Sequence, residues 1–297
     1  MLIFKYYIMK LNKCLPFLTI ITLFILVSAC QKLDRPALDL ILDPPPPAYN
    51  ALKSFWGFEN NVTDEGENKF KGTGVNVSYG AGINGQALKV GPDGYLLLKG
   101  TDTVKYPNGF VAVPIDTLKS LGSLTVAFWM NGVGPVTGGA QGLFAISNKN
   151  EFWGNLELFL DNDNTTNEAY LKVHMFNASV ASGNGEEWNE IKIPNGLNKW
   201  THIAVTYDAG TSKLNVYADG VAVIPNKTLG GGNYGTLKFK DVGGMVLGTM
   251  AFQTTPSLTN HGPEPWAKSF NGSLDQFRLY NKALSTTEIS DLFNSKK

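Results

Sequence analysis

The sequence predicts an all-β protein, an antiparallel β-sandwich or jelly roll, and two observations lead to this prediction. Short runs of β-branched and aromatic residues recur along the chain, and several alternate apolar with polar residues, which is the period of a half-buried strand. The 32 glycines, together with many asparagines and threonines, provide the frequent turns that such a fold needs. No amphipathic helical pattern interrupts the series until the C-terminus.

The stretch KWTHIAVTYDAGTSKLNVYADG, residues 199–220, illustrates the pattern. Its second half places Leu214, Val216 and Ala218 on one face and polar residues between them, as in a strand with one face in the core. The Asp-Ala-Gly and Asp-Gly steps supply turns, because Asp and Gly tolerate positive φ. We expect strands at residues 52–58, 86–90, 94–98, 123–130, 143–147, 156–160, 169–176, 191–193, 200–207, 213–218, 237–240, 245–248 and 273–280.

One short helix is expected near the C-terminus. Ser285-Thr-Thr-Glu288 has the spacing of a capping box, in which the serine and the glutamate each satisfy a free backbone N–H. The residues Ile289, Leu292 and Phe293 then form a small apolar face.

Residues 1–29 are expected to be a signal peptide and not part of the fold. An apolar run, residues 15–27, is followed by Val-Ser-Ala-Cys30, which resembles the lipobox of bacterial lipoproteins, so Cys30 is the predicted lipidation site. Met9 is the better candidate initiator, because a complete lipoprotein signal begins there. The other cysteine, Cys14, lies within the signal, and the mature chain therefore has no internal disulfide.

Residues 30–50 are expected to be a linker between the lipid and the folded domain, residues 51–297. Gln-Lys-Leu-Asp34 is similar to the short signal that sends Bacteroidetes lipoproteins to the outer surface of the outer membrane. The four prolines at 44–47 favour a stiff polyproline II spacer about 12 Å long. The predicted localisation is therefore the outer membrane, lipid-anchored, with the domain facing the cell surface.

The charge balance excludes nucleic acid as a partner. The chain has 25 basic and 25 acidic residues, and removing the three lysines before Cys30 leaves 22 basic residues against 25 acidic ones. A nucleic-acid-binding domain needs a basic surface, and none is indicated.

Three segments resemble the laminin G-like, concanavalin A-like jelly-roll domains of the lectin and glucanase type. They are SLTVAFWM at 123–130, KWTHIAVTYD with LNVYADG at 199–220, and GSLDQFRLYNKALS at 272–285. Their order and spacing match over residues 52–293. The resemblance implies the jelly-roll fold, and for members from Bacteroidetes it implies an association with glycan uptake.

No catalytic pattern is recognisable. Glucanases of this fold carry E-x-D-x-x-E on one strand, and the acidic runs Glu151…Glu157…Asp161 and Glu186-Glu187…Glu190 lack that period. A Gly-x-Ser-x-Gly elbow is absent, and His174, His202 and His261 form no H-x-x-x-H pair. His202, inside a strand, is interpreted as scaffold. We therefore expect that the protein is not an enzyme.

One structural calcium ion is a possibility that the resemblance raises. In the family, the aspartate matching Asp275 often helps to hold calcium near the first strand and its following loop, where Glu59, Asn60 and Asp64 offer oxygen ligands. The alternative is that Asp275 caps a turn by accepting backbone N–H groups. A second acidic stretch, residues 161–168, departs from an EF-hand loop and is interpreted as a solvated loop.

Four aromatic residues in expected loops are the candidate carbohydrate-binding residues. Trp153, Trp188, Tyr234 and Trp266 lie among Gly, Asn, Glu and Pro, where a large ring needs a reason to face water. Sugar rings stack on such side chains. The alternative is that each ring covers the edge of its own sandwich.

The sequence thus favours a surface lipoprotein with a non-catalytic carbohydrate-binding module that captures a polysaccharide or glycoconjugate. A module for protein–protein adhesion or assembly at the cell surface is the alternative. A glycoside hydrolase is the third hypothesis. The expected partner is a glycan or a surface protein, with the membrane reached through the lipid anchor only.

Overall fold

The computed structural model describes residues 49–297, except 101, 163–164, 182–184 and 297. The predicted signal peptide, Cys30 and most of the linker lie outside the described residues. Within them, no helix is long and apolar enough to cross a bilayer.

The chain folds as an antiparallel β-sandwich, as predicted. The strands are β1 (Leu52–Trp56), β2 (Lys71–Ala81), β3 (Gln86–Lys99), β4 (Val104–Lys105), β5 (Val111–Ala112), β6 (Leu124–Gly132), β7 (Ala140–Ile146), β8 (Leu156–Leu160), β9 (Ala169–Phe176), β10 (Glu186–Ile193), β11 (Thr201–Asp208), β12 (Lys213–Ala218), β13 (Val221–Thr228), β14 (Met245–Leu247), β15 (Ala267–Ser269) and β16 (Gly272–Tyr280). The helices are α2 (Pro114–Lys119) and α3 (Thr286–Ser295), with single 3₁₀ turns at η1 (Gly230–Gly232) and η2 (Ala251–Gln253).

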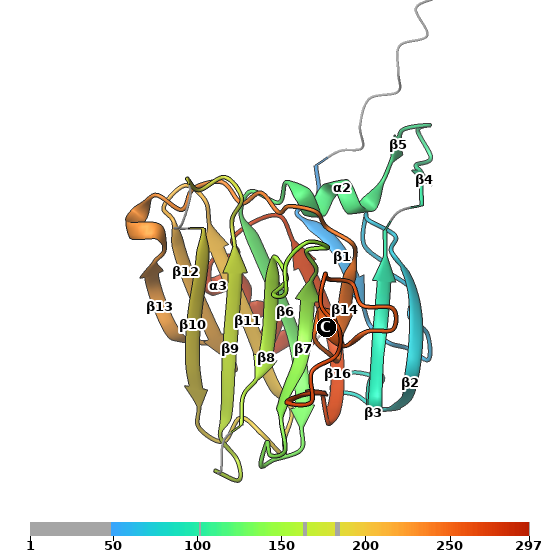
Figure 1. Ribbon diagram of the computed structural model, residues 1–297, viewed down its shortest axis with the longest axis vertical. Coiled ribbons are helices and arrows are strands. Elements are labelled where there is room, and N and C mark those ends of the chain that lie inside the picture. Colours follow the sequence, from blue (N-terminus) through green and yellow to red (C-terminus); the bar gives the residue numbers. More distant parts are fainter. Residues whose placement is uncertain (1–48, 101, 163–164, 182–184, 297) are drawn as a thin grey trace, which may run out of the picture. The chain divides into compact units, whose positions relative to one another are not determined.

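The strands hydrogen-bond in the order β10-β9-β8-β7-β14-β3-β16-β6-β11-β12-β13, and this series folds back on itself into two layers. Figure 1 shows β7 to β10 in the layer nearer the viewer and β6, β11 and β12 behind them. At the margins, β1 pairs with β16, β2 pairs with β3, and β15 pairs with β7 in the one parallel contact among the described strands.

Strand β3 belongs to both layers. Its first half, Leu88–Val90, pairs with β16, and its second half, Leu96–Leu98, pairs with β14. The bend between them contains Gly94, where a Cβ atom would lie 2.5 Å from the carbonyl oxygen of Asn76. The sequence predicted two strands here, and the structure joins them through this bend.

The core lies between the two layers, and Phe277 of β16 is fully buried within it. Its ring centroid is 5.9 Å from that of Trp56, 5.6 Å from Phe128 and 4.8 Å from Phe144. Phe128 belongs to the β6 layer and Phe144 to the β7 layer, so one ring is packed against both layers.

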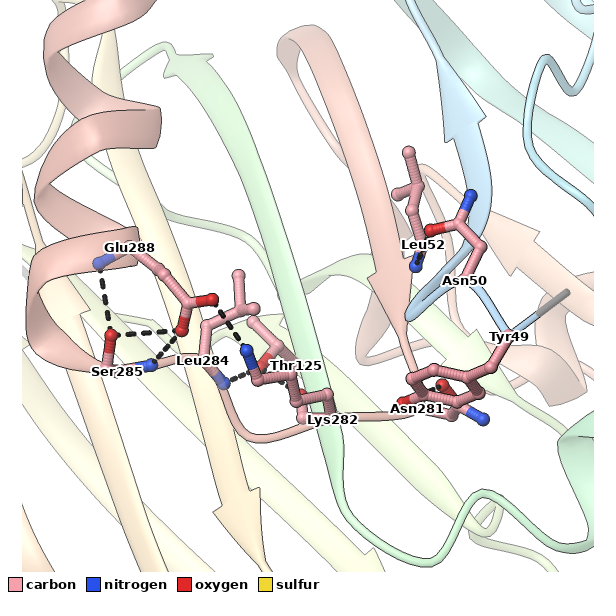
Figure 2. A network of polar contacts seen from close by, with 9 residues as sticks. All are labelled: Tyr49, Asn50, Leu52, Thr125, Asn281, Lys282, Leu284, Ser285 and Glu288. Atoms are coloured by element: carbon pink, nitrogen blue, oxygen red, sulfur yellow. Dashed lines mark hydrogen bonds and ion pairs between the residues drawn. The ribbon is translucent and has the colours of Figure 1, made fainter.

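The predicted capping box is confirmed at the start of α3. Ser285 Oγ accepts from the N–H of Glu288 at 3.3 Å, and the Glu288 carboxylate accepts from the N–H of Ser285 at 2.8 Å. Just before it, Thr125 Oγ1 of β6 donates to the carbonyl of Lys282 at 2.7 Å and accepts from the N–H of Leu284 at 2.9 Å. Figure 2 shows this network, which fixes the turn that leads into α3.

The same turn also meets the start of the described chain. The Tyr49 hydroxyl donates to the Asn281 side chain at 3.2 Å, and Asn50 accepts from the N–H of Leu52 at 3.0 Å, as Figure 2 also shows. Residues 49–52 and 281–288 are therefore held at one end of the domain.

Some sequence expectations were wrong. Residues 237–240 form no strand, only an isolated bridge between Gly122 and Leu237. The strand expected at 191–193 is only the end of β10, which begins at Glu186 and pairs along all of β9. Strands β2, β4, β5, β13 and β15 and helix α2 were not expected.

Candidate functional site

The outward face of β8, β9 and β10 carries the candidate site. On β9 the odd-numbered Leu171, Val173 and Met175 point into the core, so His174 between them points outward. The register places Glu157 of β8 and Trp188 of β10 directly beside His174, one on each side. A carboxyl group, an imidazole and an indole therefore form one row across three strands.

Three of the four predicted tryptophan and tyrosine residues meet on this face. The ring centroid of Trp153, from the β7–β8 loop, lies 4.8 Å from that of Trp188, edge to face, and 5.9 Å from that of Trp266. Trp188 is 36% exposed and Trp266 is 40% exposed. We call Phe152, Trp153, Trp188, Phe252 and Trp266 the aromatic shelf.

Stacking beneath the exposed rings holds the shelf in place. Trp153 stacks on Phe159 of β8 with 5.8 Å between centroids, and Phe152 stacks on the buried Phe252 at 4.5 Å. The loop that carries Trp266 is tied down by Gln253, whose side chain donates to the carbonyl groups of Glu264 and Ala267 at 3.0 and 2.6 Å. The shelf is thus preorganised, which lowers the entropic cost of binding a ligand.

A hollow of about 200 Å³ adjoins the shelf. It is lined by Asn148, Glu151, Phe152, Trp153, Gly154, His174, Phe176 and Glu186. Glu186 Oε1 accepts from the indole N–H of Trp188 at 3.2 Å and lies 3.1 Å from His174 Nε2. Burial lowers the pKa of His174 to about 4, against the opposing effect of the Glu186 carboxylate. His174 is therefore a neutral imidazole at neutral pH.

Glu157 is a residue that the sequence analysis did not single out as part of the site. Its side chain is buried, one oxygen accepts from the N–H of Ala251 at 3.3 Å, and Oε2 has no hydrogen-bonding partner among the described residues. Burial raises the pKa of Glu157 to about 8. No sequence signal distinguishes it, because an outward glutamate on a strand is ordinarily solvated.

Tyr234 does not belong to the shelf, which corrects the sequence prediction. It is 1% exposed, and its hydroxyl lies 3.0 and 2.8 Å from the carbonyl oxygens of Met175 and Gly185. Its ring packs edge to face on Tyr207. The surrounding glycines had indicated an exposed loop, but the loop folds inward and the tyrosine is part of the core.

Of the four predicted calcium ligands, the structure brings Glu59 and Asp275 to one loop. Asp275 accepts from the N–H groups of Ile83 and Asn84 at 2.8 and 3.3 Å, and Glu59 accepts from that of Gln86 at 3.1 Å. Burial raises the pKa of Asp275 to about 6, and the nearby Glu59 charge adds to this rise. The aspartate thus makes the backbone contacts of a turn cap, the alternative considered above.

Asp64 does not fit a shared metal site. It is buried, and its two oxygens accept from the N–H groups of Phe55, Gly66 and Phe70 at 2.9 to 3.0 Å. Asn60 is exposed. In the part of the chain that the structure describes, no group of three or more His, Cys, Asp or Glu residues is placed to hold a metal ion.

An irregularity in the pairing of β16 separates Asp275 from the core face of the strand. Regular alternation along β16 would place Asp275 on the same face as Phe277. Instead, the pairing with β6 shifts between Asp275 and Arg278, where Gln276 has φ 50°, so Phe277 points into the core and Asp275 does not. His202 is buried 5.2 Å from the Trp129 ring, as expected of scaffold.

A family model described as the concanavalin A-like lectin/glucanases superfamily matches residues 104–290. The chain belongs to this superfamily. Its match covers most of the strands that carry the shelf, including β7 to β10. No curated protein sequence matches the chain closely enough to be called a relative.

Solved structures confirm the jelly-roll fold. The receptor-binding domain of a botulinum neurotoxin C/D mosaic serotype superposes with a TM-score of 0.56 at 11% identity, over 83% of this chain and 51% of that chain. The serotype D ligand-binding domain, in complex with N-acetylneuraminic acid, has a TM-score of 0.53 at 11% identity over 83% and 51%. The serotype DC binding domain, in complex with rat synaptotagmin II, has a TM-score of 0.53 at 15% identity over 82% and 51%. This chain spans about half the length of those chains.

Proposed function

We propose that this protein is a non-catalytic carbohydrate-binding module whose ligand lies on the aromatic shelf. The observation that carries the proposal is that Trp153, Trp188 and Trp266, from three separate segments, meet on one exposed face. Indole rings offer apolar faces for the C–H faces of sugars, and the neighbouring Glu151, Asn148 and Glu186 offer hydrogen-bonding groups for hydroxyls. Most rings of the shelf already pack on other rings, so little order is lost on binding.

The neighbours support a binding role for this fold. One of these binding domains is in complex with N-acetylneuraminic acid, and another is in complex with rat synaptotagmin II. A protein partner is therefore the second candidate, and it would use the same exposed rings.

Truncating the exposed indoles tests the proposal. We expect Trp188→Ala and Trp266→Ala to weaken binding to polysaccharide roughly tenfold or more, because removing an aromatic anchor commonly costs over about 1.4 kcal/mol. Tyr49→Ala, which removes a ring that is 72% exposed but distant from the shelf in the fold, is the matched control and should bind normally. Affinity electrophoresis and calorimetry against a polysaccharide panel measure this. Binding that survives both tryptophan changes would refute the site, and copurification of a protein without glycan would favour the second candidate.

We propose further that the module is anchored to the outer membrane, facing the cell surface, through lipid on Cys30. The support is the sequence alone, namely the lipobox-like Val-Ser-Ala-Cys30 and the prolines that follow. Cells that express the protein should incorporate an alkynyl fatty acid into it, and Cys30→Ser should abolish the label and release the protein from the membrane fraction. Protease added to intact cells should degrade the wild type. Labelling of the Cys30→Ser variant would contradict the anchor.

Calcium binding is proposed at Glu59, in the segment after β1, and Asp275 of β16, which both contact one loop. A bound cation would offset the repulsion between the two carboxylates, so calcium should raise the melting temperature. Glu59→Gln should remove that rise, while Glu65→Gln, which neutralises a nearby exposed carboxylate, should keep it. A melting temperature that is the same in calcium and in chelator would rule the ion out.

A further inference from the structure

The charged side chains that line the hollow beside the shelf are both acidic. Its lining holds two carboxylates, Glu151 and Glu186, and neither lysine nor arginine. The Glu151 carboxylate has no ion pair within the described residues. His174 adds no positive charge, because burial keeps its imidazole neutral at neutral pH.

Two lysines on the neighbouring strands are engaged elsewhere. Lys172, two residues before His174, lies between Asp161 at 3.4 Å and Glu190 at 2.7 Å. Lys227 donates to the backbone carbonyl of Trp188 at 3.2 Å. An anionic ligand would therefore meet no lysine or arginine among the residues that line the hollow.

The two carboxylates that line the hollow offer hydrogen-bond acceptors only. When His174 Nε2 donates to Glu186, its Nδ1 carries a lone pair. This buried Nδ1 has no partner among the described residues, and His174 is only 2% exposed. Carboxylate oxygens match a ligand that brings donors, and an ammonium group brings three donors and no acceptor.

The indole rings beside the hollow also favour a cationic ligand. Trp153 and Trp188 meet edge to face with 4.8 Å between centroids, and both border the carboxylates. A cation held over an indole face is attracted by the ring quadrupole, and tryptophan is the strongest such ring. Apolar rings combined with carboxylates bind cationic groups that are carried on an apolar body.

We propose that this hollow selects sugars that carry a free, protonated amine, so that the ligand is an amino sugar polymer and not an N-acetylated or acidic one. The inference rests on the proposed carbohydrate-binding function. It assigns charge recognition to Glu151 and Glu186 and ring stacking to Trp153 and Trp188. Sialic acids and uronic acids are excluded by repulsion from the two carboxylates.

A matched pair of ligands tests the inference. Oligomers of glucosamine and of N-acetylglucosamine of equal length share one backbone and differ in charge. At a mildly acidic pH that protonates the amine, calorimetry on the purified protein should show the glucosamine oligomer binding roughly fivefold to tenfold more tightly. The advantage should shrink as salt is added, because exposed charges are screened.

Charge-neutral variants show where the selectivity arises. Glu186→Gln and Glu151→Gln should each reduce the preference for the amine while the affinity for the N-acetylated oligomer is kept. Glu190→Gln removes the same charge from the same strand without lining the hollow, and it should leave the preference intact. Equal binding of the two oligomers, or a preference that persists in Glu186→Gln, would overturn the inference and leave the carbohydrate-binding function standing. Binding of neither oligomer, together with no effect of Trp188→Ala on any polysaccharide, would overturn both.

Discussion

Replacing Phe277 with alanine is expected to lower the free energy of unfolding by about 3–5 kcal/mol. The ring is fully buried and lies within 6 Å of the rings of Trp56, Phe128 and Phe144, centroid to centroid. Because these three rings come from β1, β6 and β7, the cavity left by truncation opens between the two layers, where neither can collapse inward without breaking its strand pairing.

Equilibrium unfolding in urea measures the loss. Phe293→Ala is the control, since that ring lies on α3 at the outer face of the sandwich and is only half-buried, and it should cost clearly less. A loss below about 1 kcal/mol for Phe277→Ala would show that the layers repack around the missing ring, contrary to this account of the core.

Replacing Glu157 with glutamine is expected to change how stability depends on pH. Burial raises the pKa of the folded-state carboxyl from 4.5 to about 8, so between these values the folded chain binds a proton that the unfolded chain has released. Stability from this group is fully present below pH 4.5 and is lost as the pH rises to about 8. The loss is on the order of 5 kcal/mol.

The glutamine variant lacks this titration but keeps the acceptor for the Ala251 N–H. Its amide adds a donor without a partner, so it should be no more stable than the wild type at acidic pH and more stable at alkaline pH. The measurement is the difference in free energy of unfolding between variant and wild type across the pH range. Glu151→Gln, an exposed carboxylate one loop away, should show a flat difference. A flat difference for Glu157→Gln as well would mean that water or movement of the shelf solvates this carboxyl.

Both predictions concern residues, Phe277 and Glu157, whose surroundings cannot be inferred from the alternation of apolar and polar residues along a strand. Residues 156–160, 169–176 and 213–218 were predicted with the bounds that the structure has, because β-branched and apolar residues there face a core on alternate positions. Strand β2 has no fully buried residue, and its small and polar side chains give no such signal. Strand β13 is similarly exposed. These strands form because β3 and β12 offer them a free edge.

The candidate site, like the fold, was predicted only in part from the sequence. Trp153, Trp188 and Trp266 were predicted as binding candidates because they are large rings in polar surroundings, and the structure brings those three together. Tyr234 was predicted as a candidate for the same reason, but its ring lies in the core. A local pattern cannot separate these cases, because whether a loop ring faces water depends on the segment that folds over it.

The sequence by itself determined the fold class, the capping box at Ser285 and the residue types able to hold a sugar. These follow from local rules, namely the period of a strand, the free N–H groups at a helix start and the chemistry of an indole. Only the tertiary structure decided that three tryptophans meet, that Glu157 lies buried beside His174, and that two carboxylates line a hollow that has no lysine or arginine in its lining. Proximity and desolvation arise between segments distant in the chain, so no single segment encodes them.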